Sequence, residues 1–204
     1  MIKNIIFDVG NVFVKWSPQD IVERCFNLQK GSDENVQRAE ALFRCPLWMS
    51  LNRGELTQRE AEQAYQAEFG LSEKETTTLF FHVMDHQDLI EGTEEIAYRL
   101  RKAGYRIFAL TDNVHEIVAH LKARQRFWDV FEGAVVSAEV GMLKPAPAIF
   151  QHALDKFGLL AEETVFFDDV EVNVEGARSI GLEARLFTTP SRCEADLQAL
   201  GLSF

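Results

Sequence analysis

The chain has 204 residues, of which 47% are apolar and 26% are charged. This composition is typical of a globular protein with one domain, or with one core domain that carries an insertion, and it excludes a disordered chain. The formal net charge is -11, so the surface as a whole would repel a nucleic acid or an anionic membrane, and we expect neither as a partner. An anionic substrate therefore needs a local cation.

The first apolar run of the chain ends at Asp8. It is too short for a signal peptide or a membrane span, so the default expectation is a cytoplasmic protein. The chain has three cysteines, an odd number, and none has Cys-x-x-Cys spacing; they are Cys25, Cys45 and Cys193. This usage fits reduced thiols with a structural role.

A single predicted strand, residues 3–8, precedes a long helical block. Residues 17–86 show almost no strand signal. Signals for helix starts lie at Ser17, which precedes a proline, and at Thr57 and Ser72, each of which is followed by a glutamate at the spacing of a capping box. We therefore expect a small all-helical subdomain inserted after the first strand.

After Gly92 the pattern changes to alternating helices and strands. Strands are predicted at 105–110, 133–137, 164–168 and 183–187, and helices at 93–103, 114–125, 147–157, 172–180 and 192–200. Strands too apolar to alternate, separated by helices, predict an α/β fold with a Rossmann-like parallel sheet and helices on both faces. The core domain would comprise residues 1–15 and 87–204, and the helical subdomain residues 16–86.

Polar side chains follow the predicted strands at their carboxyl ends. Asp8, Thr111 and the pair Asp168-Asp169 stand there, and parallel strands bring such ends to one edge of the sheet. Carboxylates about 4 Å apart repel by roughly 4 kcal/mol per pair at an effective dielectric constant near 20. A divalent cation would neutralise them, and oxygen ligands without a histidine or cysteine cluster favour Mg²⁺.

The same residues predict phosphoryl transfer on a small phosphorylated metabolite. Asp8 could bind the metal through one oxygen and attack phosphorus with the other, which gives an aspartyl-phosphate intermediate. Thr111 would donate its hydroxyl to a phosphoryl oxygen. Lys144 would offset negative charge on both the nucleophile and the phosphate.

Four segments resemble, in order, the four motifs of the haloacid dehalogenase (HAD) superfamily; they are Phe7–Val12, Leu110–Asn113, Gly141–Pro145 and Phe167–Asn173. The resemblance covers nearly the whole chain and includes a helical cap of the C1 type after the first motif. It implies a Rossmann-like core, Mg²⁺ dependence and Asp8 as the nucleophile.

The resemblance also implies roles for other residues of these motifs. The metal ligands would be Asp8, the backbone carbonyl of Gly10 and Asp169. Asp168 and Asn173 would lie in or near the shell around them, orienting water and the lysine. Asp112 and Asn113, next to the motif-two hydroxyl, are candidate substrate-binding residues.

Two positions depart from the HAD pattern. Phosphatases of the superfamily usually carry a second Asp at the position of Gly10, where general acid-base help is commonly worth about 10² to 10⁴ in rate. The resulting Asp-x-Gly-Asn sequence resembles the sugar-1-phosphate phosphatases, notably those acting on glucose 1-phosphate, whose hemiacetal leaving group departs more readily than an ordinary alcohol. The second departure is Asp112, at a position where Asn is common. Because a carboxylate would repel the phosphate, we expect its side chain to point away from the phosphate.

The cap should close over the site, and it offers further candidate contacts for the substrate. Arg53 could bind a sugar or a second anion, and Trp16 and Trp48 could do so as well, although aromatic packing within the cap also explains the two tryptophans. His115, just after the second motif, could reach the leaving group.

Two alternative functions remain open at this point. A metal-independent 2-haloacid dehalogenase would use Asp8 on carbon, but Asp168 and Asp169 without a metal would repel its carboxylate substrate. A catalytically weak metabolite-binding or regulatory module would explain Gly10 and Asp112. The physiological substrate, the group that replaces the missing acid and the oligomeric state stay undetermined by the sequence.

Overall fold

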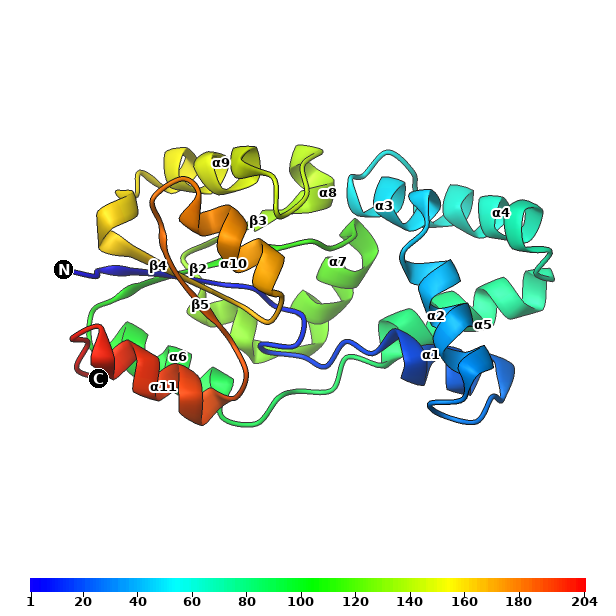
Figure 1. Ribbon diagram of the computed structural model, residues 1–204, viewed down its shortest axis with the longest axis horizontal. Coiled ribbons are helices and arrows are strands. Elements are labelled where there is room, and N and C mark those ends of the chain that lie inside the picture. Colours follow the sequence, from blue (N-terminus) through cyan, green and yellow to red (C-terminus); the bar gives the residue numbers. More distant parts are fainter.

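A five-stranded parallel sheet forms the centre of the protein, as the computed structural model of residues 1–204 shows (Figure 1). The strands are β1 (Asn4–Phe7), β2 (Arg106–Thr111), β3 (Gly133–Val136), β4 (Thr164–Asp168) and β5 (Glu183–Leu186). Their order is β3-β2-β1-β4-β5, so β1 lies in the middle and pairs with both β2 and β4. The carboxyl ends of these three strands are therefore neighbours at one edge.

Helices cover both faces of the sheet; they are α6 (Thr93–Lys102), α7 (His115–Arg124), α8 (Ser137–Val140), α9 (Pro147–Phe157), α10 (Glu171–Arg178) and α11 (Pro190–Ala199). Side chains alternate across each strand. Ile5 and Phe7 face the core formed with α6, α7 and α11, whereas Ile6 faces the core formed with α9 and α10. This arrangement confirms the predicted Rossmann-like sheet.

The remaining α-helices form a separate group beyond the carboxyl edge of the sheet (Figure 1), which we call the helical group; they are α1 (Pro18–Phe26), α2 (Asp33–Phe43), α3 (Pro46–Asn52), α4 (Gln58–Phe69) and α5 (Glu73–Asp85). Two stretches of chain join it to the sheet, one on each side of the insertion. They run side by side, because Lys15 N–H donates to Asp88 O at 2.8 Å and Ile90 N–H donates to Phe13 O at 2.8 Å. Both ends of the chain lie at the opposite end of the sheet.

Most predicted boundaries agree with the structure, and the helix at 147–157 and the strand at 164–168 are confirmed to the residue. Thr57 and Ser72 both form the predicted capping boxes. The strand predicted at 133–137 ends one residue early, because Ser137 already begins the short helix α8. The last helix begins at Pro190 instead of 192, because the side chain of the preceding threonine accepts the N–H of Arg192 and caps it there.

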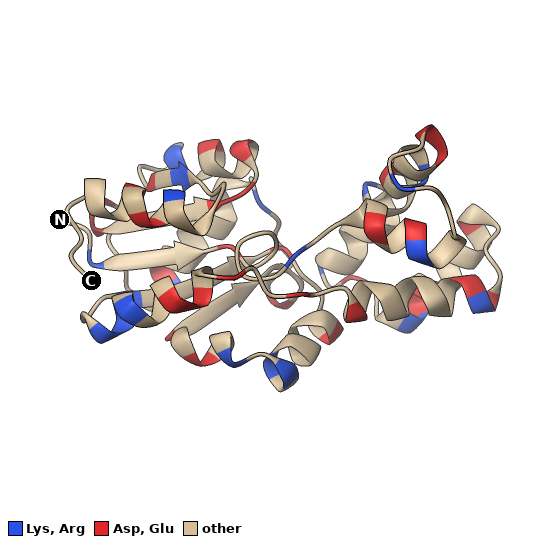
Figure 2. Ribbon diagram, turned by 90° about the horizontal axis from the view of Figure 1, so that it is seen from below, with Lys and Arg blue, Asp and Glu red and all other residues tan.

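None of the helices combines the length and the apolar character that crossing a lipid bilayer requires. Acidic positions stand in the loops between the sheet and the helical group (Figure 2). These loops contain the residues of the candidate site.

Candidate active site

Lys144 is the charged centre of the carboxyl edge. Its Nζ lies 2.9 Å from Asp8 Oδ1 and 2.6 Å from Asp168 Oδ2, and it donates to the backbone oxygen of Leu110 at 3.3 Å. An ammonium group has three N–H donors, so these partners use all of them. The side chain of Lys144 is 1% exposed. It holds Asp8 through Oδ1 and leaves Asp8 Oδ2 without a protein partner.

The pKa values of Asp8 and Lys144 are both raised, but for different reasons. Burial raises the pKa of Asp8 to about 7; Lys144 acts against this shift and Asp168 adds to it. Burial alone would lower the pKa of Lys144, but the carboxylates of Asp8, Asp168 and Asp112 outweigh it and raise that pKa. The lysine thus stays charged over the physiological range, and Asp8 is the group whose protonation changes near neutral pH.

Asp168 is held by several neighbours. It is fully buried; Oδ1 accepts from the N–H of Val170 at 2.8 Å and from Asn173 Nδ2 at 3.0 Å, and Oδ2 accepts from Lys144. Since both of its oxygens are already occupied, Asp168 has little capacity left for an additional ligand. Its contacts instead fix the position of Lys144.

Asp169 presents a different environment. Its Oδ2 accepts a hydrogen bond from Asn11 Nδ2 at 3.0 Å, whereas Oδ1 has no side-chain donor. One oxygen each from Asp8, Asp168 and Asp169 lie within 4.8 Å of one another. With Asp168 occupied, the free oxygens of Asp8 and Asp169 form a pair of hard ligands that fits a divalent cation.

Asn11, the last residue of the Asp-x-Gly-Asn sequence, was given no role in the site by the sequence. Besides holding Asp169, it accepts the backbone N–H of Trp16 on Oδ1 at 2.9 Å. Its φ of 51° is left-handed, a conformation that Asn tolerates better than most residues. An Asn directly after Gly10 was the available signal, because that dipeptide favours a tight turn.

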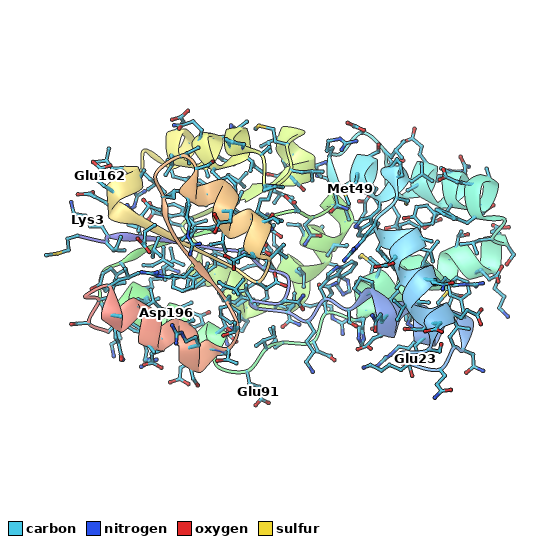
Figure 3. All side chains as sticks on the ribbon, in the orientation of Figure 1. Lys3, Glu23, Met49, Glu91, Glu162 and Asp196 are labelled. Atoms are coloured by element: carbon cyan, nitrogen blue, oxygen red, sulfur yellow. The ribbon has the colours of Figure 1, made fainter.

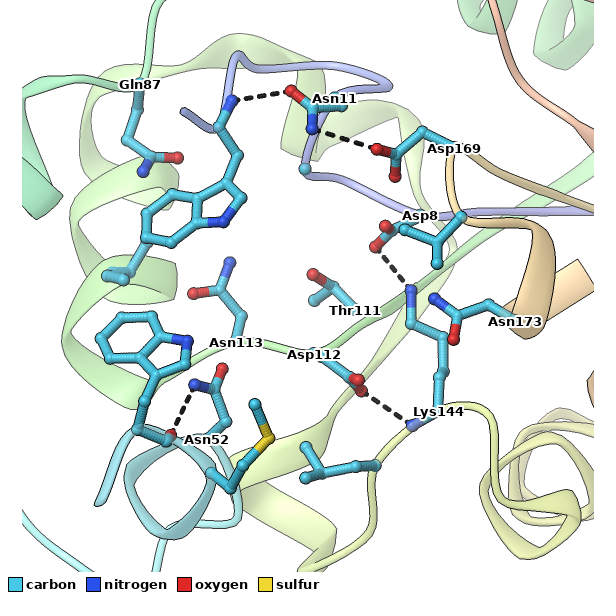
Figure 4. Close-up of a pocket in the computed structure, with 17 residues that line it drawn as sticks. Asp8, Asn11, Asn52, Gln87, Thr111, Asp112, Asn113, Lys144, Asp169 and Asn173 are labelled. Atoms are coloured by element: carbon cyan, nitrogen blue, oxygen red, sulfur yellow. Dashed lines mark hydrogen bonds and ion pairs between the residues drawn. The ribbon is translucent and has the colours of Figure 1, made fainter. Parts of the chain in front are cut away.

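Thr111 is the last residue of β2 and Asp112 follows it, so both lie at the same edge (Figure 4). The hydroxyl of Thr111 has no hydrogen-bond partner in the protein and borders the cavity described below. Asp112 also borders that cavity, but its Oδ1 accepts the backbone N–H of Lys144 at 3.1 Å. Burial raises the pKa of Asp112. The carboxylate thus ties the end of β2 to the loop that carries the lysine.

A cavity of about 330 Å³ separates this edge from the helical group. Trp16 and Trp48 line it and stack on each other, with ring centres 5.6 Å apart and planes 9° from parallel, and Phe43 meets both edge-on. Met49 lies in α3, on the side of the helical group that faces the sheet (Figure 3), and also lines the cavity. The two tryptophans thus pack together, as one of the two readings predicted, and still border the cavity.

Two candidate substrate contacts lie away from the cavity. The guanidinium of Arg53 bonds to Glu55 at 2.6 Å and to Ser50 at 3.3 Å. His115, the first residue of α7, is exposed to solvent. Neither side chain lines the cavity, so the geometry does not support the substrate contacts expected of them.

Three amide side chains complete the far wall of the cavity: Asn52, Gln87 and Asn113. Only Asn113 was predicted. Asn52 and Gln87 carry no sequence signal of their own, because their significance depends on the folding of distant segments around one cavity.

Comparison with known proteins agrees with this geometry. A family model for haloacid dehalogenase-like hydrolases matches residues 2–181. A D-ribitol-5-phosphate phosphatase of Bacteroides thetaiotaomicron is 26% identical over 192 residues, which cover 90% of each chain. A sesquiterpene phosphatase of Aspergillus oryzae is 24% identical over 180 residues, which cover 88% of this chain and 87% of the relative.

Solved structures show the same fold. A HAD-like hydrolase of Porphyromonas gingivalis superposes with a TM-score of 0.77 at 22% identity and full coverage of both chains. A HAD family enzyme of B. thetaiotaomicron, solved as a variant with magnesium and inorganic phosphate, gives a TM-score of 0.75 at 21% identity and covers 93% of this chain and 95% of its own. The sheet, the four motifs and the match of the family model over most of the chain agree, and the protein belongs to the haloacid dehalogenase-like hydrolase family.

Proposed function

We propose that the protein is a Mg²⁺-dependent phosphatase that hydrolyses a small phosphomonoester through an aspartyl-phosphate on Asp8. The observation that carries the proposal is the state of three oxygens at one edge of the sheet. Asp8 Oδ2, Asp169 Oδ1 and the hydroxyl of Thr111 have no side-chain donors or acceptors within the protein. They are the groups that a phosphoryl transfer needs, and Lys144 holds the nucleophile among them.

The donor set suits Mg²⁺. Asp8, Asp169 and the backbone carbonyl of Gly10 would hold the ion, and Asp168 and Asn173 would support the lysine rather than the metal. Hard oxygen ligands and the absence of a histidine or cysteine among the clustered side chains agree with this assignment. When bound, the cation would neutralise the carboxylates and draw charge from the phosphoryl oxygens.

In the first step Asp8 Oδ2 attacks phosphorus and the bond from phosphorus to the leaving-group oxygen breaks, so that an acyl phosphate forms on Asp8 and the alcohol departs with a proton from water. In the second step water adds to phosphorus, the bond from phosphorus to Asp8 Oδ2 breaks and Asp8 is restored as a carboxylate, while the proton that this water loses neutralises the hydroxide left by the first step. Thr111 donates its hydroxyl to a phosphoryl oxygen, and Lys144 stabilises the carboxylate through both steps.

A two-part organisation accompanies this chemistry. Residues 1–15 and 87–204 would form the core and residues 16–86 a cap of the C1 type. The cavity between the sheet edge and the helical group supports this division, because it places the leaving group against the cap. Closure would exclude bulk water from the reacting phosphate.

A sugar phosphate such as glucose 1-phosphate is the substrate we propose. Gly10 supplies no acid, which favours a leaving group that departs easily, and the hemiacetal of a sugar 1-phosphate is such a group. The name of the bacterial relative, a D-ribitol-5-phosphate phosphatase, supports a polyol or sugar phosphate in the same cavity.

The test is a phosphate-release screen over sugar, nucleotide and amino-acid phosphates, with Mg²⁺ and with EDTA. We expect Mg²⁺-dependent release that is lost in Asp8→Asn. Release that survives this substitution unchanged would overturn the mechanism. Halide release from a 2-haloacid that is insensitive to EDTA would instead establish dehalogenation by the same aspartate.

A further inference from the structure

The far wall of the cavity is built from neutral amides, and this sets it apart from the charged sheet edge. Asn52 ends α3, Gln87 lies in the second connection between the helical group and the sheet, and Asn113 follows β2. Figure 4 shows all three on the side of the cavity away from Lys144 and Asn173. We call Asn52, Gln87 and Asn113 the amide wall.

One hydrogen bond anchors each side chain of the amide wall. Asn52 Nδ2 donates to Trp48 O at 2.8 Å, Gln87 Nε2 donates to Val83 O at 3.0 Å, and Asn113 Oδ1 accepts the N–H of Val114 at 2.9 Å. These contacts also settle which end of each amide is oxygen, because only the N–H end of a side-chain amide can donate to a backbone carbonyl and only its oxygen can accept from a backbone N–H.

The other ends of the amide wall have no partner in the protein. Asn52 Oδ1 and Gln87 Oε1 accept nothing and Asn113 Nδ2 donates to nothing, yet Asn52 is 5% exposed and Gln87 is 6% exposed. These atoms open onto the cavity and are not sealed inside the protein. Buried polar groups are normally hydrogen-bonded, so unpartnered acceptors and donors in one cavity indicate a ligand that supplies both kinds of partner.

We propose that Asn52 and Gln87 determine specificity, because the amide wall recognises the hydroxyls of the neutral sugar or polyol leaving group proposed above. A hydroxyl both donates and accepts, and it can therefore satisfy the free oxygens and the free N–H groups. Trp16 and Trp48 supply apolar faces for the carbon skeleton beside it. The cavity volume of about 330 Å³ suits one such group, at the small end of ligand sites, which span roughly 300–1,000 Å³.

The same wall argues against two other leaving groups. The amide wall contains no cation, and Lys144, the one basic residue that lines the cavity, lies on the opposite side and is paired with Asp8 and Asp168. A second phosphate or a carboxylate at the wall would therefore meet no free cation in a protein whose net charge is -11. A purely apolar leaving group would strip water from the amides without replacing its hydrogen bonds. Sites built to bind hydroxyls reject analogues that lack them by large factors.

The inference rests on the proposed function, and matched substrate pairs separate the two. Sorbitol 6-phosphate and n-hexyl phosphate share a carbon chain and a primary ester but differ in hydroxyls. Fructose 6-phosphate and fructose 1,6-bisphosphate differ in the second anion. p-Nitrophenyl phosphate, which has an acidic leaving group and no hydroxyls to bind, reports the phosphatase chemistry alone.

We expect kcat/KM for sorbitol 6-phosphate to exceed that for n-hexyl phosphate by about 100-fold or more, and fructose 6-phosphate to exceed the bisphosphate. Asn52→Leu and Gln87→Met should each raise KM for sorbitol 6-phosphate by about tenfold or more, and should change kcat/KM for p-nitrophenyl phosphate by a much smaller factor than kcat/KM for sorbitol 6-phosphate. Gln66→Met, the same change at a side chain that bonds Thr76 away from the cavity, should alter neither substrate.

Titration calorimetry of Asp8→Asn with Mg²⁺ gives a reading without turnover, and sorbitol 6-phosphate should bind more tightly than n-hexyl phosphate. Equal or better binding and turnover of n-hexyl phosphate would overturn the inference while leaving the phosphatase intact. A protein that releases phosphate from neither p-nitrophenyl phosphate nor sorbitol 6-phosphate would contradict the proposed function instead. Loss of both substrates in Gln87→Met would show a structural role for that side chain and reject it as a specificity determinant.

Discussion

At the scale of single residues, the aspartates Asp8 and Asp168 differ in how many of their oxygens have partners in the protein. Asp168 is fully buried and both of its oxygens accept hydrogen bonds, whereas Asp8 keeps one oxygen free. A carboxylate whose oxygens are all occupied positions its neighbours, while a free oxygen can attack. Lys144 joins the two aspartates, and this explains why one buried cation serves a site with several negative charges.

The missing acid gives a prediction at Gly10. A Cβ built there would meet only Trp16 Cβ, at 3.8 Å, which is ordinary contact, and the backbone is not left-handed. Gly10→Asp should therefore fit and place an acid near the leaving group. We expect kcat for an alkyl phosphate such as sorbitol 6-phosphate to rise by about 10² and that for p-nitrophenyl phosphate to change little.

Gly10→Asn is the matched control, because it adds a side chain of the same size without a proton to donate. Steady-state kinetics of both variants on both substrates checks the prediction. Equal gains in the two variants would show that the side chain acts by shape, and no gain in Gly10→Asp would show that another group already supplies the proton.

At the scale of elements, the contact between α3 and α8 holds the helical group against the sheet edge. Ser137 Oγ, at the start of α8, donates to Asn52 O at 2.7 Å and accepts the N–H of Asn113 at 2.8 Å. Gly54, just after α3, approaches Ala138 so closely that a Cβ would lie 2.2 Å from Ala138 O. One serine and one glycine thus fix the distance between the two sides of the cavity.

Two glycine substitutions test this contact. Gly54 and Gly70 both have left-handed backbones, with φ of +69° and +65°, but a Cβ at Gly70 would meet nothing within 4 Å. Gly70→Ala should lower the unfolding free energy by about 1–2 kcal/mol, from the backbone alone. Gly54→Ala should cost about 1–3 kcal/mol more through overpacking and raise KM, because α3 must move away from α8.

Urea unfolding and steady-state kinetics of the two variants give the comparison. If Gly54→Ala matched Gly70→Ala in stability and kept the KM of the parent protein, the close approach of α3 to α8 would not control the cavity.

The elements also show which parts of the protein the sequence could predict. The sequence was enough to predict that Asp8, Thr111, Asp168 and Asp169 lie close together. Parallel strands place their carboxyl ends at one edge, and the alternation of helices and strands predicted such a sheet. The wall opposite them was not predictable in the same way. Asn52 and Gln87 are ordinary amides in the sequence, and only the path of the chain around the cavity brings them together.

Arg53 and His115 are candidates that do not line the cavity in this structure. Arg53 pairs with its neighbour Glu55. His115, in the first turn of α7, is exposed to solvent. Their predicted substrate contacts depend on where the folded chain places these side chains, which their positions in the sequence do not specify.

At the scale of the whole molecule, proton binding, metal binding and stability are linked through Asp8. Burial raises its pKa from an ordinary value of 3.8 to about 7, so the metal-free folded protein binds more protons at Asp8 than the unfolded chain does between these values. Asp8 therefore makes the metal-free fold less stable as the pH rises through this window. Mg²⁺ requires the ionised carboxylate and should reverse the trend.

The test of this linkage is the difference in unfolding free energy between the parent protein and Asp8→Asn, in which position 8 does not titrate. In EDTA the parent protein should lose up to about 4 kcal/mol relative to Asp8→Asn between about pH 4 and pH 8. With excess Mg²⁺ the parent protein should gain stability relative to the variant, most strongly at the upper end of the range. A difference that does not change with pH in EDTA would contradict the raised pKa.

The most direct test of the account is to trap the phosphorylated intermediate. The protein is mixed with Mg²⁺ and a ³²P-labelled substrate from the screen, quenched in acid within a single turnover, reduced with borohydride and digested for mass spectrometry. We predict label on the protein before reduction and, after it, a reduced residue at position 8, with neither in Asp8→Asn. Label on another residue, or normal turnover without any labelled protein, would contradict Asp8 as the nucleophile.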